Sequence, residues 1–421
     1  MSIVCGMNEL SSCRICRSSE LVLLWELKSC PYGDLFKDTY EESLRVTPQP
    51  IELSKCIKCG LVQLLRQTDI HSQYDNYIYQ TKVTKGLNKF YDGLVRKLIA
   101  EYPEVKSDNG FVLDIGSNDG SFLEFFRKIG ISTLGVEPSE SASATANDDG
   151  IETIKDYFNL EISRKILLEY GQPKIISLNY TLANIPDIKN LFSDISSIMN
   201  DETIISIVTG YHPDQFIVNM FDYIGHDHLT YLCLQDFVNI AAEFDLTILD
   251  ANRYEHKGGS LHVTLALNTS MYKENISSNV QQLLQRERWM AIGEDKFYKD
   301  LAWRIEVATS ELNVFLEKND IKTIPAVGAS ISTTYLMNQF GVSEQISHLL
   351  DDDKLKQGRF SPYFGKQVYP MSEASQGSQS YILLLAWQHT DRIIERLEEV
   401  GFSGKLIIPL PMLRVLDYSK Q

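Results

Sequence analysis

The chain has 421 residues, 43% of them hydrophobic and 23% charged, which is typical of a globular protein with two or three domains. Its formal net charge of −16 argues against a broad nucleic-acid-binding surface, because phosphate binding requires a basic face. No apolar run is long enough for a membrane helix, and the N-terminus lacks the basic and apolar regions of a secretory signal, so we expect a cytoplasmic protein without membrane contact.

Cysteines are concentrated at the beginning of the chain, where they form two Cys-x-x-Cys pairs, Cys13 with Cys16 and Cys56 with Cys59. In a cytoplasmic protein such clustering indicates metal binding rather than disulfides. Four thiolates complete a tetrahedral site suited to zinc, although the two pairs are further apart than in common zinc ribbons. Because a four-cysteine site leaves no open position for a substrate, we predict a structural zinc ion in an N-terminal zinc-binding domain.

A nucleotide-binding pattern follows. Residues 87–102 have the apolar spacing of a helix, residues 111–115 form a short apolar strand, and residues 116–120 read Gly-Ser-Asn-Asp-Gly before a further helix. The next strand ends in an acidic residue that can hold ribose hydroxyls. The turn lacks the third glycine of a pyrophosphate site, so S-adenosylmethionine (SAM) suits it better than NAD. We expect SAM to contact Asp114, Gly116, Ser117, Asn118, Gly120 and Glu137.

Further strands are expected at residues 174–187 and 202–212, and the carboxyl end of the first would lie over the cofactor. Gly258 and Gly259 separate two apolar strands, so they form either a plain hairpin turn or a backbone lip that brings Ser260 to the substrate. After helices within residues 279–319, a strand, a turn at Gly328 and a helix predict a second Rossmann-like unit. Its basic stretch, residues 354–359, either attracts a diphosphate or is a solvated loop.

The segment Gly-His-Asp-His-Leu-Thr-Tyr, residues 225–231, contains His226, Asp227 and His228. A histidine can act as a general base because its ordinary pKa lies near working pH. In a strand, residues two apart share a face, so the two histidines could instead share a metal ion. They could also be loop residues without a role.

Together these residues resemble the SAM-dependent sugar C-methyltransferases, which methylate ring carbons of nucleotide-linked keto-deoxysugars. The similar segments, in chain order, are CRIC, CIKCGLVQL, YDNYIYQT, VLDIGSNDGSFLEFF, GVEPS, HKGGSLHV, DKLKQGRFSPYFG and LLLAWQ. The resemblance implies an α/β protein with a zinc-binding domain (1–80), a Rossmann-like class I SAM methyltransferase domain (81–290) and a Rossmann-like C-terminal domain that helps bind the sugar nucleotide (291–421).

The resemblance also implies residue roles. His228 corresponds to the base that removes the proton next to the keto group, with His226 and Asp227 beside it, and the resulting enolate attacks the methyl group of SAM. Tyr79 looks like a further active-site tyrosine. The family's tyrosine before the first histidine is Gly225 here, its glutamate is Asp227, and a histidine at a strand end is Asn184, which can still donate a hydrogen bond.

Two other functions share the cofactor pattern. The chain could be a SAM-dependent O- or N-methyltransferase with an added zinc domain, which needs no enolising base. It could also be a binding homologue whose activity is impaired by Gly225 and Asn184. We expect the protein to be a monomer or a small homo-oligomer that binds a nucleotide-linked sugar.

Overall fold

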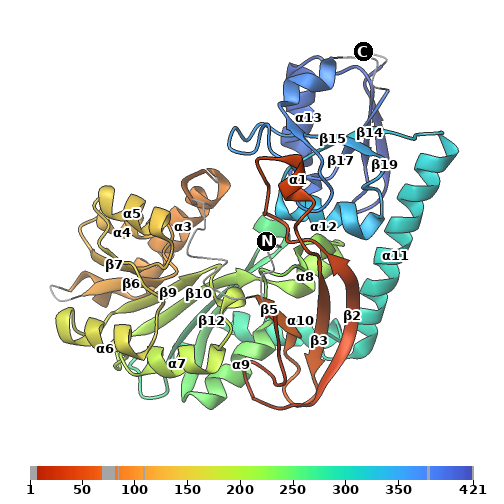
Figure 1. Ribbon diagram of the computed structural model, residues 1–421. Helices are drawn as coiled ribbons and strands as arrows, with labels where there is room; N and C mark the ends of the chain where they lie inside the picture. The colour runs from red at the N-terminus through yellow and green to blue at the C-terminus, as the bar shows by residue number, and fades with distance from the viewer. Residues whose placement is uncertain (1–6, 69–80, 84, 108–109, 377–379, 420–421) are drawn as a thin grey trace.

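The computed structural model describes residues 7–68, 81–83, 85–107, 110–376 and 380–419. Three larger sheets organise this part of the chain: an N-terminal antiparallel sheet, a central seven-stranded sheet and a C-terminal six-stranded sheet (Figure 1). The expected α/β class, with a cysteine-bearing N-terminal part and two Rossmann-like units, is confirmed. No helix within the described ranges is long and apolar enough to cross a membrane.

The N-terminal sheet has the strand order β11-β4-β3-β2, so it includes one strand from the middle of the chain. Thr230 and Tyr231 of that strand pair antiparallel with Gln63 and Val62. A short separate ladder joins β1 to β5. The elements of this part are β1 (Met7–Glu9), β2 (Leu21–Cys30), α1 (Tyr40–Ser43), β3 (Gln49–Cys56), β4 (Val62–Leu64), β5 (Arg66–Thr68) and β11 (Thr230–Tyr231).

The central sheet has the order β12-β13-β10-β9-β6-β7-β8, with parallel strands from β10 to β8 and an antiparallel hairpin, β12-β13, at one edge. Its strands are apolar on both faces because helices cover both, as in doubly wound sheets. The elements are η1 (Thr81–Val83), α3 (Lys85–Glu101), η2 (Pro103–Lys106), β6 (Phe111–Ile115), α4 (Leu123–Arg127), β7 (Ser132–Val136), α5 (Glu140–Asp148), β8 (Thr153–Ile154), α6 (Leu160–Glu169), β9 (Ile175–Asn179), η3 (Leu182–Asn184), α7 (Ile188–Ser196), β10 (Ile204–Gly210), α8 (His212–Ile217), η4 (Phe221–Tyr223), α9 (Leu234–Glu243), β12 (Leu246–Tyr254), η5 (His256–Gly258) and β13 (Ser260–Leu267).

The C-terminal sheet has the order β16-β15-β14-β17-β18-β19 and is parallel except at β19. The long helix α11 runs from beside the N-terminal sheet up to this unit (Figure 1). The elements are α10 (Ser278–Trp289), α11 (Asp295–Lys318), β14 (Ile324–Val327), α12 (Ile331–Phe340), β15 (Ile346–Leu350), β16 (Val368–Tyr369), η6 (Met371–Ser375), β17 (Tyr381–Leu384), η7 (Trp387–His389), α13 (Thr390–Glu399), β18 (Lys405–Ile408) and β19 (Arg414–Asp417).

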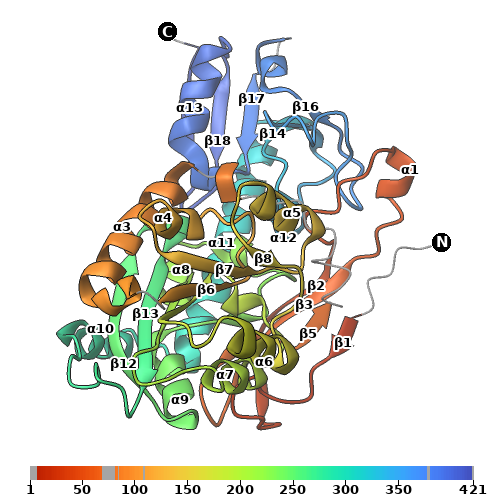
Figure 2. The ribbon, with the colours of Figure 1, turned by 90° about the vertical axis from the view of Figure 1, so that its left-hand side faces the viewer.

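The units share their hydrophobic cores. One cluster contains Leu53 of the N-terminal sheet, Leu312 of α11 and Leu336 of α12, and another contains Cys13, Cys56 and central-sheet residues. Polar contacts also join the parts: Lys356 donates to Asp34 at 2.7 Å, and Arg359 pairs with Asp38. Two of the basic residues in stretch 354–359 are therefore engaged by the N-terminal part. The predicted boundaries at residues 80 and 290 stay a prediction. Figure 2 shows the central unit from the side, below the C-terminal unit.

Candidate active site

The four predicted zinc ligands come together. The Sγ atoms of Cys13, Cys16, Cys56 and Cys59 all lie within 4.8 Å of one another, a spacing that suits a tetrahedral metal ion bound by four thiolates. The two pairs lie on matching turns, in which the fourth residue after the first cysteine, Arg17 or Gly60, has a positive φ and donates its N–H to the carbonyl of that cysteine. The cysteines therefore fit the predicted structural zinc ion.

The first cysteine turn lies against the chain that follows β9. The side chain of Arg14 is fully buried and donates from Nη1 to the carbonyl of Pro186 at 2.9 Å. Arg17 forms an ion pair with Asp187. On the other turn, the carbonyl of Cys59 accepts a hydrogen bond from Asn239 of α9 at 2.8 Å. The two cysteine turns thus contact the central unit at the residues that follow η3 and at α9.

The predicted cofactor turn lies at the carboxyl end of β6. Gly116 and Gly120 both have positive φ, and a Cβ on Gly116 would lie 2.5 Å from Oγ1 of Thr181, so only glycine fits there. Asp114 accepts hydrogen bonds from Ser177 Oγ at 2.6 Å and Asn179 Nδ2 at 3.2 Å. Burial raises the pKa of Asp114 to about 7 despite these two hydrogen bonds. A cationic ligand group would favour its charged form.

The acidic end of β7 closes the turn. The Glu137 carboxylate accepts from the N–H groups of Asn118 and Ser139, both at 2.9 Å, and its pKa is raised by burial. Oγ of Ser117 is buried without a hydrogen-bond partner, which leaves it available for a ligand. Asn118 also accepts from the N–H of Thr81 at 3.0 Å, so the predicted cofactor residues and the start of η1 form one group.

The histidine loop, residues 225–229, lies beside this group. Leu229 donates its N–H to the carbonyl of Ala183 at 2.8 Å, which holds the loop against η3 and Asn184. The ring of His228 stacks on Tyr223 with centroids 3.9 Å apart. Burial, together with the nearby charge of Lys257, lowers the pKa of His228 to about 4, so its imidazole is neutral at pH 7.

His226 and Asp227 have different surroundings. The buried ring of His226 stacks on Tyr32 at 4.8 Å, and burial lowers its pKa to about 4. Burial, together with the charge of Asp34, raises the pKa of Asp227 to about 7. Within the described ranges the two histidines belong to no group of three metal-ligating side chains, so the shared-metal interpretation gains no support.

The structure explains why residue 225 is glycine. A Cβ on Gly225 would lie 2.0 Å from Cε2 of Tyr335, a residue of α12 in the C-terminal unit. The hydroxyl of Tyr335 accepts the N–H of His226 at 3.1 Å and lies 3.4 Å from His226 Nδ1. A phenol from the C-terminal unit therefore occupies the space next to the loop's first histidine. Tyr79 lies outside the described residues.

Tyr180, His256 and Lys257 were not predicted individually, whereas Ser260, which joins them, was. Tyr180 follows β9, within the strand end that was expected over the cofactor, and has a positive φ of 57°. Its hydroxyl contacts His256 Nε2 and lies 2.8 Å from Ser260 Oγ, while Lys257 lies over its ring. Two sequence features could have identified these residues: the position of Tyr180 at a strand end and the glycine pair at 258–259. The glycines form a tight connection between β12 and β13, with Ser260 at the start of β13.

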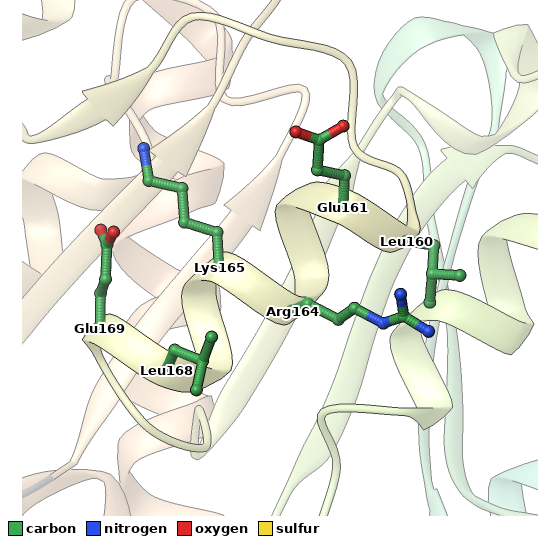
Figure 3. Close-up of a pocket in the computed structure, with 6 residues that line it drawn as sticks. All are labelled: Leu160, Glu161, Arg164, Lys165, Leu168 and Glu169. Atoms are coloured by element: carbon green, nitrogen blue, oxygen red, sulfur yellow. The ribbon is translucent and has the colours of Figure 1, made fainter.

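A hollow of about 570 Å³ lies elsewhere, on the outer face of α6. Its lining residues come from that single helix, and several of their side chains spread away from one another (Figure 3). It is a surface depression with no convergent polar groups, so the strand ends of the central sheet remain the candidate site.

Comparisons with known proteins bear on the whole chain. The family described as "C-methyltransferase C-terminal domain" matches residues 255–411, and the "methyltransferase domain" family matches residues 87–251. The C-methyltransferase NovU of Streptomyces niveus is 26% identical over 420 residues, which is 98% of each chain.

Solved structures show more distant likenesses. Magnesium protoporphyrin IX methyltransferase from Synechocystis PCC 6803, with bound SAM, is 13% identical over 44% of this chain and 81% of its own, with a TM-score of 0.32. A SAM-dependent methyltransferase from Archaeoglobus fulgidus is 15% identical over 42% and 93%, with a TM-score of 0.34. At these scores neither structure informs the geometry of the site.

Proposed function

Because the chain belongs to the SAM-dependent C-methyltransferases, we propose that it methylates a ring carbon of a nucleotide-linked keto-deoxysugar and that His228 is the base. The cofactor is SAM, and the substrate of such an enzyme is a small molecule. Bound SAM supplies a methyl group that is activated by the positive charge on its sulfur. The observation that carries the proposal is the neutral, stacked imidazole of His228 at the strand ends.

The proposed cofactor site is the turn after β6. Glu137 accepts ribose hydroxyls at the end of β7, and the Asp114 carboxylate favours the cationic amino group of the methionine part. Gly116 and Gly120 leave room for the ligand, while Ser117 and Asn118 contact it from the loop. These assignments agree with the buried, unpartnered Oγ of Ser117.

The proposed reaction needs one proton transfer before the methyl transfer. His228 takes the proton from the carbon next to the carbonyl, and the C–H electron pair becomes the enolate π bond. The enolate carbon then forms a bond to the methyl carbon as the carbon–sulfur bond breaks and its electrons return to sulfur. The keto group is restored, and His228 must return its proton to solvent before the next turnover.

The other predicted residues receive supporting roles. Asn184 follows Ala183, whose carbonyl accepts the N–H of Leu229, and its amide can donate a hydrogen bond to the carbonyl oxygen of the substrate. The proposed role of Asp227 is to orient an imidazole of the loop, as carboxylates often do. His226, buried between Tyr32 and Tyr335, supports the loop rather than touching the substrate. Tyr79 keeps its role as a proposed active-site tyrosine from the linker.

The proposal is tested by proton exchange in D₂O with a nucleotide-linked 4-keto-6-deoxysugar and no SAM. The wild-type protein should exchange the proton next to the carbonyl, and His228→Asn should lose this exchange by at least about 100-fold. His348→Asn, on β15 of the C-terminal sheet, is the matched control. Methyl transfer to oxygen or nitrogen without exchange would favour the other class of methyltransferase. Binding of SAM and sugar nucleotide without either reaction would indicate an impaired homologue.

A further inference from the structure

Lys257 holds its charge in an unusual place. It lies in η5 between β12 and β13 with a left-handed φ of 53°, and its Nζ is 3.8 Å from the centre of the Tyr180 ring. The residue is half-buried, and burial lowers its pKa to about 8, so the ammonium is still charged at pH 7. Among the ion pairs of the described residues, none involves Lys257, so no carboxylate in this part of the chain neutralises it. An unneutralised, partly desolvated cation requires a reason.

The ring below Lys257 is fixed by a hydrogen-bonded chain. The Tyr180 hydroxyl contacts Nε2 of His256 and lies 2.8 Å from Oγ of Ser260, and that Oγ donates to the carbonyl of His256 at 2.9 Å. Gln215 donates from Nε2 to the carbonyl of Lys257 at 3.1 Å. These hydrogen bonds fix the aromatic ring and the backbone that position Lys257, as expected for a side chain that must contact a reacting atom.

His228 converges on the same strand end. A Cβ on Gly210, the last residue of β10, would lie 3.0 Å from Nε2 of Gln215 and 3.2 Å from Cε1 of Tyr223. Gln215 anchors Lys257, and Tyr223 carries the stacked ring of His228. The residues that hold Lys257 and His228 therefore meet at the end of β10, next to the end of β9, and the charge of Lys257 is close enough to lower the pKa of His228.

Enolisation of the substrate requires a group that stabilises the enolate oxygen, and it also requires a base that can remove the proton. As the base takes a proton, negative charge accumulates on the carbonyl oxygen, and a fixed donor aimed at that oxygen gives a large stabilisation in a site that excludes water. The imidazole of His228, whose pKa is lowered, is also a weaker base than a solvated histidine. A weak base removes a carbon-bound proton only if the enolate is strongly stabilised. A cation beside the base meets this demand and keeps the imidazole neutral.

We propose that Lys257 is a catalytic residue whose ammonium group donates a hydrogen bond to the enolate oxygen of the substrate while His228 removes the proton. This inference rests on the proposed function. No proton passes to or from Lys257 in the cycle: it stays protonated, the substrate proton goes to His228, and the oxygen becomes a carbonyl again after methyl transfer.

The test combines D₂O exchange without SAM, steady-state methyl transfer and SAM titration, with a nucleotide-linked 4-keto-6-deoxysugar as substrate. For Lys257→Met we expect exchange and kcat to fall about 100- to 1,000-fold, the loss typical of one removed oxyanion donor. KM and the Kd for SAM should change less than about threefold. Lys257→Arg should recover at least a tenth of the exchange rate. Lys322→Met, at an exposed lysine in the C-terminal part, should match the wild type.

The result that overturns the inference is undiminished exchange and kcat in Lys257→Met, or a rise in KM alone, which would make Lys257 an anchor for the diphosphate. If Lys257→Met does not bind SAM or melts early, Lys257→Gln and Lys257→Arg decide by the same readouts. The two proposals fail differently. Absence of exchange in the wild type, or full exchange in His228→Asn, removes the proposed function together with this inference. Loss in His228→Asn but not in the lysine variants removes the inference alone.

Discussion

The cofactor turn and the histidine loop lie side by side, yet they are built in different ways. The cofactor residues from Asp114 to Glu137 come from one strand-turn-helix-strand segment, in which Glu137 accepts the N–H of Asn118, although Asp114 also accepts hydrogen bonds from β9. The histidine loop is held by residues from every part of the chain: Tyr32, Ala183, Tyr223 and Tyr335. The first site is a local motif, and the second exists only when all three units have docked.

Removal of zinc should have the largest effect, and it should impair the histidine loop much more than the cofactor turn. Because the cysteine turns support Pro186 and share a sheet with β11, a Cys16→Ser variant or a chelated protein should lose methyl transfer and D₂O exchange by more than about 100-fold. SAM affinity should fall far less. The measurements are zinc content by mass spectrometry, SAM titration and exchange. Cys30→Ala, at a buried cysteine outside the group of four, should keep its zinc; full activity in the metal-free protein would contradict the expectation.

A change in the cofactor turn should have the opposite selectivity. Glu137→Gln removes a charge that accepts two backbone N–H groups, so the Kd for SAM should rise about 10-fold, which corresponds to ~1.4 kcal/mol. Exchange without SAM should stay within about twofold of the wild type. Glu140→Gln, three residues further along on α5, is the matched control. Equal losses in SAM binding and exchange would show that the two regions are not separable.

Tyr335→Phe tests the contact from the C-terminal unit. Loss of the hydroxyl removes the acceptor for the His226 N–H, and a hydrogen bond worth about 1 kcal/mol predicts a roughly fivefold fall in kcat with unchanged SAM affinity. Tyr381→Phe, whose hydroxyl faces Asn319 on the outside of the same unit, is the comparison. A change in thermal stability without a change in kcat would assign Tyr335 a purely structural role.

The smallest expected effect is that of pH on the exchange rate near neutrality. The base must be neutral, and because burial and Lys257 lower the pKa of His228 to about 4, the exchange rate should be nearly flat from pH 7 to pH 5 and fall as the pH drops through 4. Exchange rates between pH 3.5 and 8 give the profile. Lys257→Met should move the acidic limb upward, since it removes a positive charge. An acidic limb near 6.5 in the wild type would contradict the burial argument.

The same contrast explains which parts of the molecule could be predicted from sequence. The spacing within each cysteine pair and the pattern from Asp114 to Glu137 are short-range signals, since a single turn or strand end places each pair and the residues of the cofactor turn. No such signal exists for Tyr335, which is 109 residues from His226. The pairing of β11 with β4 and the approach of Lys257 to His228 also depend on tertiary packing.

In the histidine loop, the residue types alone did not predict the surroundings of each side chain. His226 and His228 are two positions apart, yet one is enclosed by Tyr32 and the other stacks on Tyr223. Gly225 looked like a lost tyrosine, but the ring of Tyr335 from another unit fills that space.

The antiparallel pairing of β11 with β4 has a consequence for protein engineering. Residues 230–231 and 62–63 form one ladder although they are far apart in the sequence, so a chimera should take both segments from the same parent protein. A chimera that exchanges only the first seventy residues between two homologues would pair the edge strand β11 of one parent with β4 of the other. Exchanging the segment from 183 to 231 along with it would keep that ladder, and swaps of substrate preference between relatives should be designed on this pair of segments.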